Sequence, residues 1–180
     1  MTDKTRARVG NECQRSTTLK FELLDKIESL SDGRIVALKQ VSLAEEYLAD
    51  HFPTFPVLPG VMMLEALTQA ATWLLHARSG FASSMAVLKE ARNVKYGRFV
   101  EPGAALRVEV ELSKPTDAGA LFKAAGTVNG QPAVSARLEL AYFRLSEKDP
   151  ALASLDERLI SHARKRWAVL NARSDVAMNL

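Results

Sequence analysis

Apolar and polar positions alternate along the first part of the chain in a way that predicts two strands. Residues 19–30 and 34–42 are strand-like, and the turn sequence "SDG" between them favours a hairpin. Residues 43–50, "LAEEYLAD", predict a short helix before a proline-rich stretch. Residues 1–17 are polar and contain no apolar run, so we expect a flexible leader and no secretory signal.

The most apolar segment begins at Gly60 and predicts one long helix. It ends near Arg78, where a basic residue followed by a glycine is typical of a helix C-terminus. Since apolar residues occupy most of its positions, we expect this helix to be buried on nearly all sides. No stretch approaches about 18 consecutive apolar residues, so a membrane-spanning helix is not expected.

Further strand-like runs follow this helix, with turn signals between them. In "LRVEVEL" apolar and charged residues alternate strictly, which is typical of an antiparallel strand with one solvent-exposed face. The sequence "NGQP" at 129–132 predicts a tight hairpin turn. The runs cover residues 84–100, 105–114, 121–128 and 133–145. We therefore expect an α+β fold in which one curved antiparallel sheet wraps around one long central helix.

Residues 146–180 have a different pattern, which predicts an amphipathic helix outside the main domain of residues 18–145. Ser154 and Glu157 have the spacing of a capping box that would start this helix. Its apolar face consists of Leu155, Leu159, Ala163, Trp167 and Leu170. We interpret the helix as docking on the body or on a second subunit, with the basic run "RKR" at 164–166 on its solvent side.

Composition and charge narrow the function classes. The 180 residues are 47% hydrophobic and 25% charged, as in a typical globular domain. The single cysteine, Cys13, excludes an intrachain disulfide and a thiolate zinc site, and it fits a reducing cytoplasm. The net charge of +3 suits an acidic protein partner, although an evenly solvated surface explains it more simply. Lysines and arginines form no stripe with aromatic residues, so nucleic acid is not favoured.

The long helix carries an isolated acid, Glu65, among its apolar residues. Its polar positions, at spacings of three, four, seven and eleven, share one stripe: Glu65, Thr68, Gln69, Thr72 and His76. Such a stripe is ordinarily a solvent face, but solvent faces normally carry lysines and several acids. A carboxyl group among apolar side chains has a raised pKa and donates a proton near neutrality. Glu65 is therefore a candidate general acid.

His51 stands directly before a proline-rich loop that leads into this helix. A lone histidine is more often structural than catalytic, but Pro53, Pro56 and Pro59 stiffen the loop and would hold the imidazole in place. Gly60 begins the helix, where unpaired amides favour negative charge, although a glycine at this position often has no further task. A base, an acid and an oxyanion site are what proton abstraction beside a carbonyl with loss of a β-substituent requires.

Other chemistries find less support in the sequence. The chain has no HExxH motif, no P-loop and no G-x-S-x-G motif. A metal site at His51 and Glu65 would lack a third ligand. The other two histidines, His76 and His162, have no comparable setting, and we expect them to be packing or surface residues.

The stretch "HFPTFPVLPGVMMLEALTQA" resembles the signature of the β-hydroxyacyl-acyl carrier protein dehydratases of the FabZ type. Eleven residues match that signature without a gap: His51, Phe52, Pro53, Pro56, Val57, Pro59, Gly60, Val61, Glu65, Ala66 and Gln69. Weaker similarity extends over about residues 20–143. Asp50 and Thr54 stand where that family has glycines, and of the two only an aspartate adopts a left-handed backbone readily.

The resemblance implies a hot-dog fold and a homodimer, which in turn can assemble as a trimer of dimers. It implies two active sites at the subunit interface, where His51 of one chain faces Glu65 of the other. The implied reaction removes water from a (3R)-hydroxyacyl thioester on acyl carrier protein and gives the trans-2-enoyl thioester. His51 would take the α-proton, Glu65 would protonate the departing hydroxyl, and the Gly60 amide would hold the thioester oxygen. No metal or redox cofactor is needed.

The resemblance also implies supporting roles around this site. Gln69 would orient Glu65, and the substrate contacts would be Gln69, Val61, Phe52 and Pro59, beside an apolar tunnel for the acyl chain. Lys95 and Arg98 are candidate contacts for the acidic carrier protein. Two alternatives stay open at this point: a hot-dog thioesterase that uses water as the attacking group, and a non-catalytic acyl-binding homologue.

Overall fold

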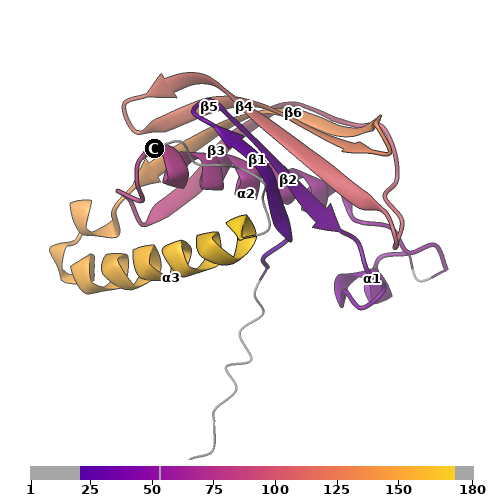
Figure 1. The fold of residues 1–180 in the computed structure, drawn as a ribbon, viewed down its shortest axis with the longest axis horizontal. Helices are drawn as coiled ribbons and strands as arrows, with labels where there is room; N and C mark the ends of the chain where they lie inside the picture. Colours follow the sequence, from indigo (N-terminus) through magenta and orange to yellow (C-terminus); the bar gives the residue numbers. More distant parts are fainter. Residues whose placement is uncertain (1–20, 53, 173–180) are drawn as a thin grey trace, which may run out of the picture.

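The computed structural model describes residues 21–52 and 54–172, and Figure 1 shows its sheet curved over one long helix. Within these residues six strands pair antiparallel in the order β1-β2-β4-β5-β6-β3. The strands are β1 (Lys26–Ser31), β2 (Arg34–Gln40), β3 (Met85–Tyr96), β4 (Ala105–Thr116), β5 (Gly119–Val128) and β6 (Gln131–Phe143). The helices are α1 (Tyr47–Asp50), α2 (Gly60–Arg78) and α3 (Ala153–Asn171), with short 3-10 turns η1 (Leu145–Glu147) and η2 (Pro150–Leu152) before α3.

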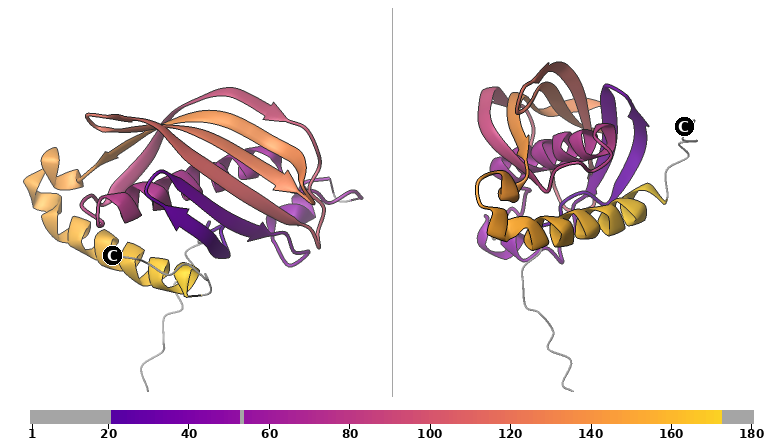
Figure 2. Two further views of the ribbon diagram at one scale, coloured as in Figure 1. Left: turned by 45° about the horizontal axis from the view of Figure 1, so that its top comes forward. Right: turned by 90° about the vertical axis from the view of Figure 1, so that its left-hand side faces the viewer.

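Helix α2 lies in the concave side of the sheet, as both views in Figure 2 show. Its small residues Ala66, Ala70 and Ala71 are fully buried, which lets the curved strands pass close to the helix backbone. Strands β4 and β5 contribute Val108 and Phe122 to the same core. This is the hot-dog arrangement, and it confirms the expected fold class.

Local signals placed several elements correctly. Helix α2 begins and ends at the predicted residues, Gly60 and Arg78. The β5–β6 turn at Asn129-Gly130 has φ of 51° and 75°, and positive φ at both positions is what a type I′ hairpin turn requires. The strand predicted over 19–30 begins only at Lys26, and before it the backbone of Phe21 and Leu23 bonds to the Gln69 side chain of α2.

Helix α3 lies beside the sheet–helix body (Figures 1 and 2). The predicted capping box is wrong, because α3 begins at Ala153 after Leu152 and has no side-chain cap. Glu157 instead forms an ion pair with Arg144. The predicted solvent position of the basic run is also wrong for Arg166, which is half-buried against the body.

Some predictions concern residues outside the part of the chain that the structure describes. The predicted leader, residues 1–17 with Cys13, is among them, and the division into leader, domain and C-terminal segment stays a prediction. Within the part of the chain that the structure describes, no helix is both long enough and apolar enough to cross a membrane.

Candidate active site

A cavity of about 410 Å³ opens at the N-terminal end of α2. It lies between the loop that leads into α2 and the segment that follows β3, and these are joined by a hydrogen bond from the Leu58 amide to the Val100 carbonyl (2.8 Å). The lining residues are His51, Phe52, Val57, Leu58, Gly60, Met63, Tyr96, Gly97, Arg98 and Phe99. The structure therefore brings together two of the three predicted catalytic residues, His51 and Gly60.

The His51 imidazole is fixed by one backbone contact. Its Nδ1 lies 3.1 Å from the carbonyl oxygen of Val57. A carbonyl only accepts, so Nδ1 must carry the proton and Nε2 keeps its lone pair. The Phe52 ring packs edge-on against the imidazole at a centroid distance of 4.4 Å. His51 is thus held in the tautomer that a general base needs.

The loop after His51 contains a strained residue. Phe52 has φ of 53°, a left-handed conformation that is costly for a bulky side chain. Among the described residues of the loop it is Phe52 that takes this conformation, and neither Asp50 nor Thr54 does. The strained residue is the direct neighbour of His51, and backbone strain is commonly found at functional sites.

Gly60 has two physical reasons to be glycine. A Cβ atom there would come within 3.1 Å of the Tyr96 ring, so the ring packs directly on the helix backbone. The carbonyl of Pro59 accepts from the amides of Met62 and Met63, whereas no acceptor among the described residues is paired with the Gly60 amide. The first turn of α2 contains no acidic residue, so its positive end is uncompensated and favours an oxyanion.

Glu65 does not line this cavity. It lies five residues beyond Gly60 and so points about 140° around the helix from it. Its Oε1 accepts a hydrogen bond of 2.9 Å from Nε2 of Gln69, one turn further on. This is the contact that an orienting role for Gln69 requires. The described chain alone does not bring Glu65 to His51, and their pairing across two chains stays a prediction.

The polar stripe on α2 is not a solvent face. Thr68 and His76 are buried, and the other members are half-buried. The Thr68 hydroxyl donates to the carbonyl of Leu64 at 3.0 Å, one turn back.

The remaining predicted residues lie around the cavity rim or beyond it. Val61 is 69% exposed on the first turn of α2, and Pro59 is the residue that precedes the helix. Arg98 lines the cavity. Lys95 is exposed near the end of β3 and does not line it. Their roles in binding substrate or carrier stay predictions.

The sequence did not predict that two aromatic residues, Tyr96 and Phe99, line the cavity. Phe99 packs edge-on against Phe55 at 5.6 Å, which ties the segment after β3 to the loop before α2. Both residues lie in "KYGRF", where aromatic side chains alternate with the two basic residues that were singled out. That alternation at a strand end was the available signal.

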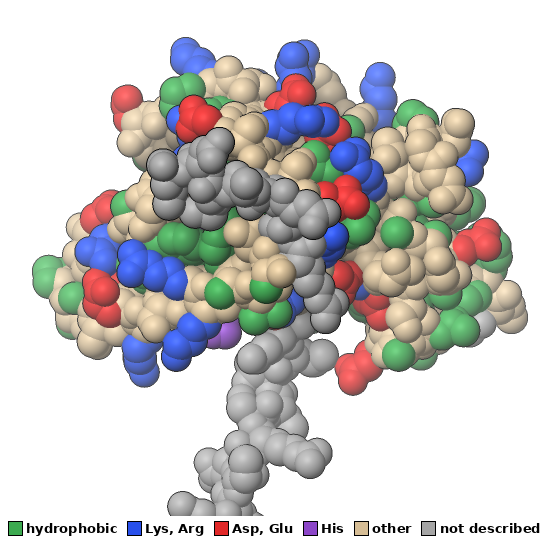
Figure 3. Space-filling view, in the orientation of Figure 1, with side chains coloured by type: hydrophobic (Ala, Val, Ile, Leu, Met, Phe, Trp, Pro, Cys, Tyr) green, Lys and Arg blue, Asp and Glu red, His purple; other side chains and the backbone are tan. Residues whose placement is uncertain are grey.

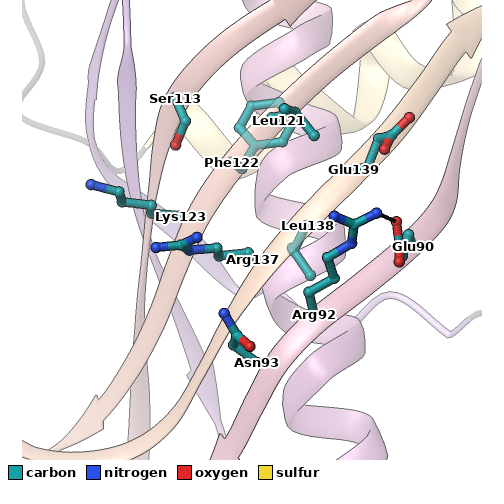
Figure 4. A pocket seen from close by; sticks show the side chains of 10 residues that line it. All are labelled: Glu90, Arg92, Asn93, Ser113, Leu121, Phe122, Lys123, Arg137, Leu138 and Glu139. Atoms are coloured by element: carbon teal, nitrogen blue, oxygen red, sulfur yellow. Dashed lines mark ion pairs between the residues drawn. The ribbon is translucent and has the colours of Figure 1, made fainter.

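A second depression, of about 390 Å³, lies on the exposed side of β3, β5 and β6 (Figure 4). Five charged residues contribute to its lining, and two of them, Glu90 and Arg92, are paired with each other. Arg92 contacts Glu90 at 2.6 Å, and Glu139 is paired with Lys89 at 2.5 Å. It contains none of the predicted site residues. Within the described residues no three His, Cys, Asp or Glu side chains converge on a metal-sized space.

With this geometry in place, relatives define the class of protein. The chain belongs to the FabA-like domain family, whose model matches residues 17–137. The 3-hydroxyacyl-[acyl-carrier-protein] dehydratase FabZ of Clostridium perfringens is 36% identical over 121 residues, which are 67% of this chain and 87% of that protein. The protein of the same name from Pelotomaculum thermopropionicum is 39% identical over 123 residues, 68% of this chain and 86% of that one.

Solved structures agree with the fold. The Dehydratase Heterocomplex ApeI:P from Xenorhabdus doucetiae matches with a TM-score of 0.61 at 20% identity, covering 74% of this chain and 90% of that one. An HP0420-homologue from Helicobacter felis matches with a TM-score of 0.54 at 12% identity, covering 72% and 85%. At these identities the likeness supports the architecture alone. Helix α3 lies beyond the residues that the family model matches.

Proposed function

We propose that this protein is a hydro-lyase that removes water from (3R)-hydroxyacyl thioesters on acyl carrier protein, giving trans-2-enoyl thioesters for fatty acid or related lipid biosynthesis in the cytoplasm. Family membership and the dehydratase relatives support the reaction class. The observation that carries the proposal is the His51 imidazole, which keeps its Nε2 lone pair in a cavity beside the unpaired Gly60 amide.

The chemistry follows from the polarity of these groups. Nε2 of His51 takes the α-proton of the substrate, and the Gly60 amide donates to the thioester oxygen as negative charge develops. The Cα–Cβ double bond forms while the Cβ–O bond breaks, and the carboxyl of Glu65 protonates the departing hydroxyl, which leaves as water. Loss of one oxyanion donor typically costs about 3 kcal/mol in the transition state.

A second copy of the chain would complete the site. The rim of the cavity exposes apolar side chains that are costly to leave in water, namely Phe52, Phe55, Val61, Tyr96 and Phe99. Among the described strands, β3 has a neighbour on one side only, so its other edge is open to pairing. A homodimer that covers this region would bring Glu65 of the partner to His51; whether dimers assemble further is left to solution measurements.

The direct test is hydration of a crotonyl thioester by the purified protein, followed by loss of the enoyl absorbance. We expect hydration without release of free thiol. Thiol release with no change in the enoyl group would establish a thioesterase instead. Tight acyl binding without turnover would establish a non-catalytic acyl-binding protein.

The shared site has its own test, in which two inactive variants are mixed. In a heterodimer of His51→Ala with Glu65→Gln, one site contains both lesions and the other contains neither. Random exchange of subunits should therefore restore about a quarter of the wild-type activity. A mixture that stays inactive after exchange, shown with differently tagged subunits, would contradict a site built from two chains.

Contacts with the carrier protein are testable separately from the chemistry. If Arg98 and Lys95 meet the acidic carrier, charge reversal of Arg98 should raise KM for an acyl carrier protein substrate. The same change should leave KM for a short pantetheine thioester nearly unaltered, because that substrate lacks the carrier surface.

A further inference from the structure

We propose that Arg166 of α3 is a positioning residue for Glu65, acting through residues 21–24 and Gln69. The inference rests on the proposed role of Glu65 as the acid. Helix α3 begins at Ala153, beyond residue 137 where the family match ends, so this support is supplied by an element outside the matched domain.

The first link is the Gln69 side chain, which uses both of its polar ends. Nε2 donates to Oε1 of Glu65 (2.9 Å) and to the carbonyl of Phe21 (2.8 Å). Oε1 of Gln69 accepts from the amide of Leu23 (2.9 Å). A flipped amide would set oxygen against two acceptors and nitrogen against a donor. The orientation of Gln69, and with it the carboxyl of Glu65, therefore depends on where residues 21–23 lie.

The second link holds residues 21–24 in place from the other side. The Arg166 guanidinium forms an ion pair with Glu22 at 2.8 Å. Its Nη2 also donates to the carbonyl of Leu24 at 3.3 Å. His162, one turn earlier on α3, lies 3.6 Å from the same carboxylate of Glu22. One side chain of α3 thus contacts both the side chain and the backbone of the segment that fixes Gln69.

Packing holds only part of this segment: Leu23 and Leu24 are 3% and 2% exposed and belong to the hydrophobic core. A cavity of about 130 Å³ remains between it, α2 and α3, and Arg166 and Gln69 both line it. Phe21 is 57% exposed, so its ring anchors the segment only weakly. Packing therefore restrains Leu23 and Leu24, and the polar contacts of Arg166 add restraint at Glu22 and at the Leu24 carbonyl.

The third link is the docking of α3 itself. Trp167, next to Arg166, packs on Trp73 of α2 at 5.8 Å, and Leu170 is 2% exposed. Near the start of the helix, buried Asp156 accepts from the amides of Leu145 and Ser146, each at 2.9 Å. The guanidinium therefore projects from a helix that is fixed at both ends.

Loss of the guanidinium should affect the chemical step more than substrate binding. Residues 21–24 would lose their restraint, Gln69 would sample other rotamers, and the carboxyl of Glu65 would spend less time aligned with the leaving hydroxyl. Neither Arg166 nor Glu22 lines the cavity that contains His51 and Gly60. The expected signature is a lower kcat at nearly unchanged KM.

The test compares Arg166→Met with Lys165→Met in the full-length protein. Both remove one positive charge and keep a long apolar stem, but Lys165 is exposed on the outer face of α3, where Figure 3 shows other Lys and Arg side chains. We expect kcat for crotonyl thioester hydration to fall about tenfold in Arg166→Met and to change less than about twofold in Lys165→Met. Arg166→Lys should recover part of the loss, because its charge still reaches Glu22.

Two further variants separate positioning from simple damage. In a Gln69→Ala background, Arg166→Met should cause no further loss of kcat, because the connection is already broken. Glu22→Gln leaves α3 unchanged and should lower kcat in the same direction. Additive losses in the double variant, or an unchanged kcat in both Arg166→Met and Glu22→Gln, would overturn the proposal.

Hydrogen exchange supplies a readout that needs no activity. The Leu23 amide, which donates to Gln69, should exchange faster in Arg166→Met than in wild type or Lys165→Met. Unchanged protection at Leu23 would refute the connection even if the protein hydrates no thioester. If the wild-type protein hydrates no thioester but the Leu23 amide still exchanges faster in Arg166→Met, the proposed function is refuted and the structural connection stands.

Discussion

The two ends of α2 differ sharply in how they meet their surroundings. At the N-terminal end the Gly60 amide has no described partner, and Phe52 and Val61 are 56% and 69% exposed. At the C-terminal end Trp73 and His76 pack into an aromatic cluster with Phe81, Tyr142 and Trp167. The open end leaves a cavity and apolar side chains accessible, whereas the closed end is packed into the fold.

The histidine at each end shows what this difference means chemically. His51 is half-buried and presents a free Nε2 to a cavity. His76 is 5% exposed, its Nδ1 lies 3.0 Å from the Tyr142 hydroxyl, and its ring stacks on Phe81. Burial lowers the pKa of His76 to about 4, so it stays neutral near pH 7. Accessibility, and not residue type, separates the candidate base from the structural histidine.

The largest effect is expected when the open end loses its imidazole. His51→Ala should lower kcat/KM for enoyl-thioester hydration by about 10²–10⁴-fold, because a positioned general base is removed. The free energy of unfolding should change by only about 1 kcal/mol, the value of one hydrogen bond. Steady-state kinetics and denaturant unfolding measure the two. A fully active His51→Ala enzyme would remove the basis of the proposed function.

The opposite pattern is expected at the closed end. His76→Ala should lower the free energy of unfolding by about 2–4 kcal/mol, since it leaves a cavity among aromatic rings and removes one partner of the Tyr142 hydroxyl. The kcat of the protein that remains folded should stay near the wild-type value. A variant as stable as wild type, or one that is stable but inactive, would show that the two ends are not divided in this way.

Lowering the pH should reveal the same difference between the two ends of α2 through its effect on the free energy of unfolding. The folded pKa of His76, about 4, lies below the ordinary histidine value of 6.5, so between these pH values the unfolded chain binds a proton that the folded chain does not. Stability should therefore fall by about 3 kcal/mol as the pH drops from above 6.5 to 4. Denaturant unfolding across this range measures it, and His76→Gln should lack this part of the slope.

A second group, Asp156, affects the free energy of unfolding at a lower pH than His76 does. The two pH ranges can therefore be measured separately. Burial alone would raise the pKa of Asp156, but hydrogen bonds from Ser84, Ser146 and the Leu145 amide outweigh it and hold the pKa well below its usual range. Its contribution is present above the ordinary aspartate pKa and is lost only as the pH falls below it. A slope at pH 4–6.5 that persists in His76→Gln would assign the effect to another group.

The smallest effect is expected for the hydroxyl at the closed end. Tyr142→Phe keeps the ring and removes contacts to His76, to Ser79 (2.9 Å) and to the backbone of Ser83. The free energy of unfolding should fall by about 1–2 kcal/mol, with kcat unchanged. Tyr47→Phe, at a tyrosine near the open end, is the matched comparison. A loss of kcat in Tyr142→Phe as large as the loss in Tyr47→Phe would contradict the distinction between the two ends of α2.

Patterns confined to a few neighbouring residues predicted their structures well. The run of apolar residues between Gly60 and the Arg78–Gly80 boundary defined α2, and Asn129-Gly130 defined a hairpin turn, because backbone preferences there decide the conformation. The capping box at Ser154 failed for the same kind of reason. Its spacing was right, but η2 had already started the chain into helix before Ser154.

The sequence predicted individual residues of the candidate site better than it predicted the lining of the cavity. His51, Gly60 and Glu65 stood out from the sequence, and the structure places the first two in one cavity. The walls formed by Tyr96 and Phe99 come from a segment more than thirty residues away, so no local pattern connects them to His51. The basic run of α3 was interpreted as solvated because its contacts with residues 21–24 are also distant in sequence.

The sequence by itself determined the helix that carries Glu65, the turn chemistry of the sheet, and the polar residues proposed for the dehydration. Those features depend on side-chain periodicity and backbone preference, which act over a few residues. Only the tertiary structure decided which end of α2 is open, which histidine is buried, and that Arg166 reaches the segment holding Gln69. These depend on contacts between residues up to 144 positions apart, as in the pair of Arg166 with Glu22, which chain folding alone brings together.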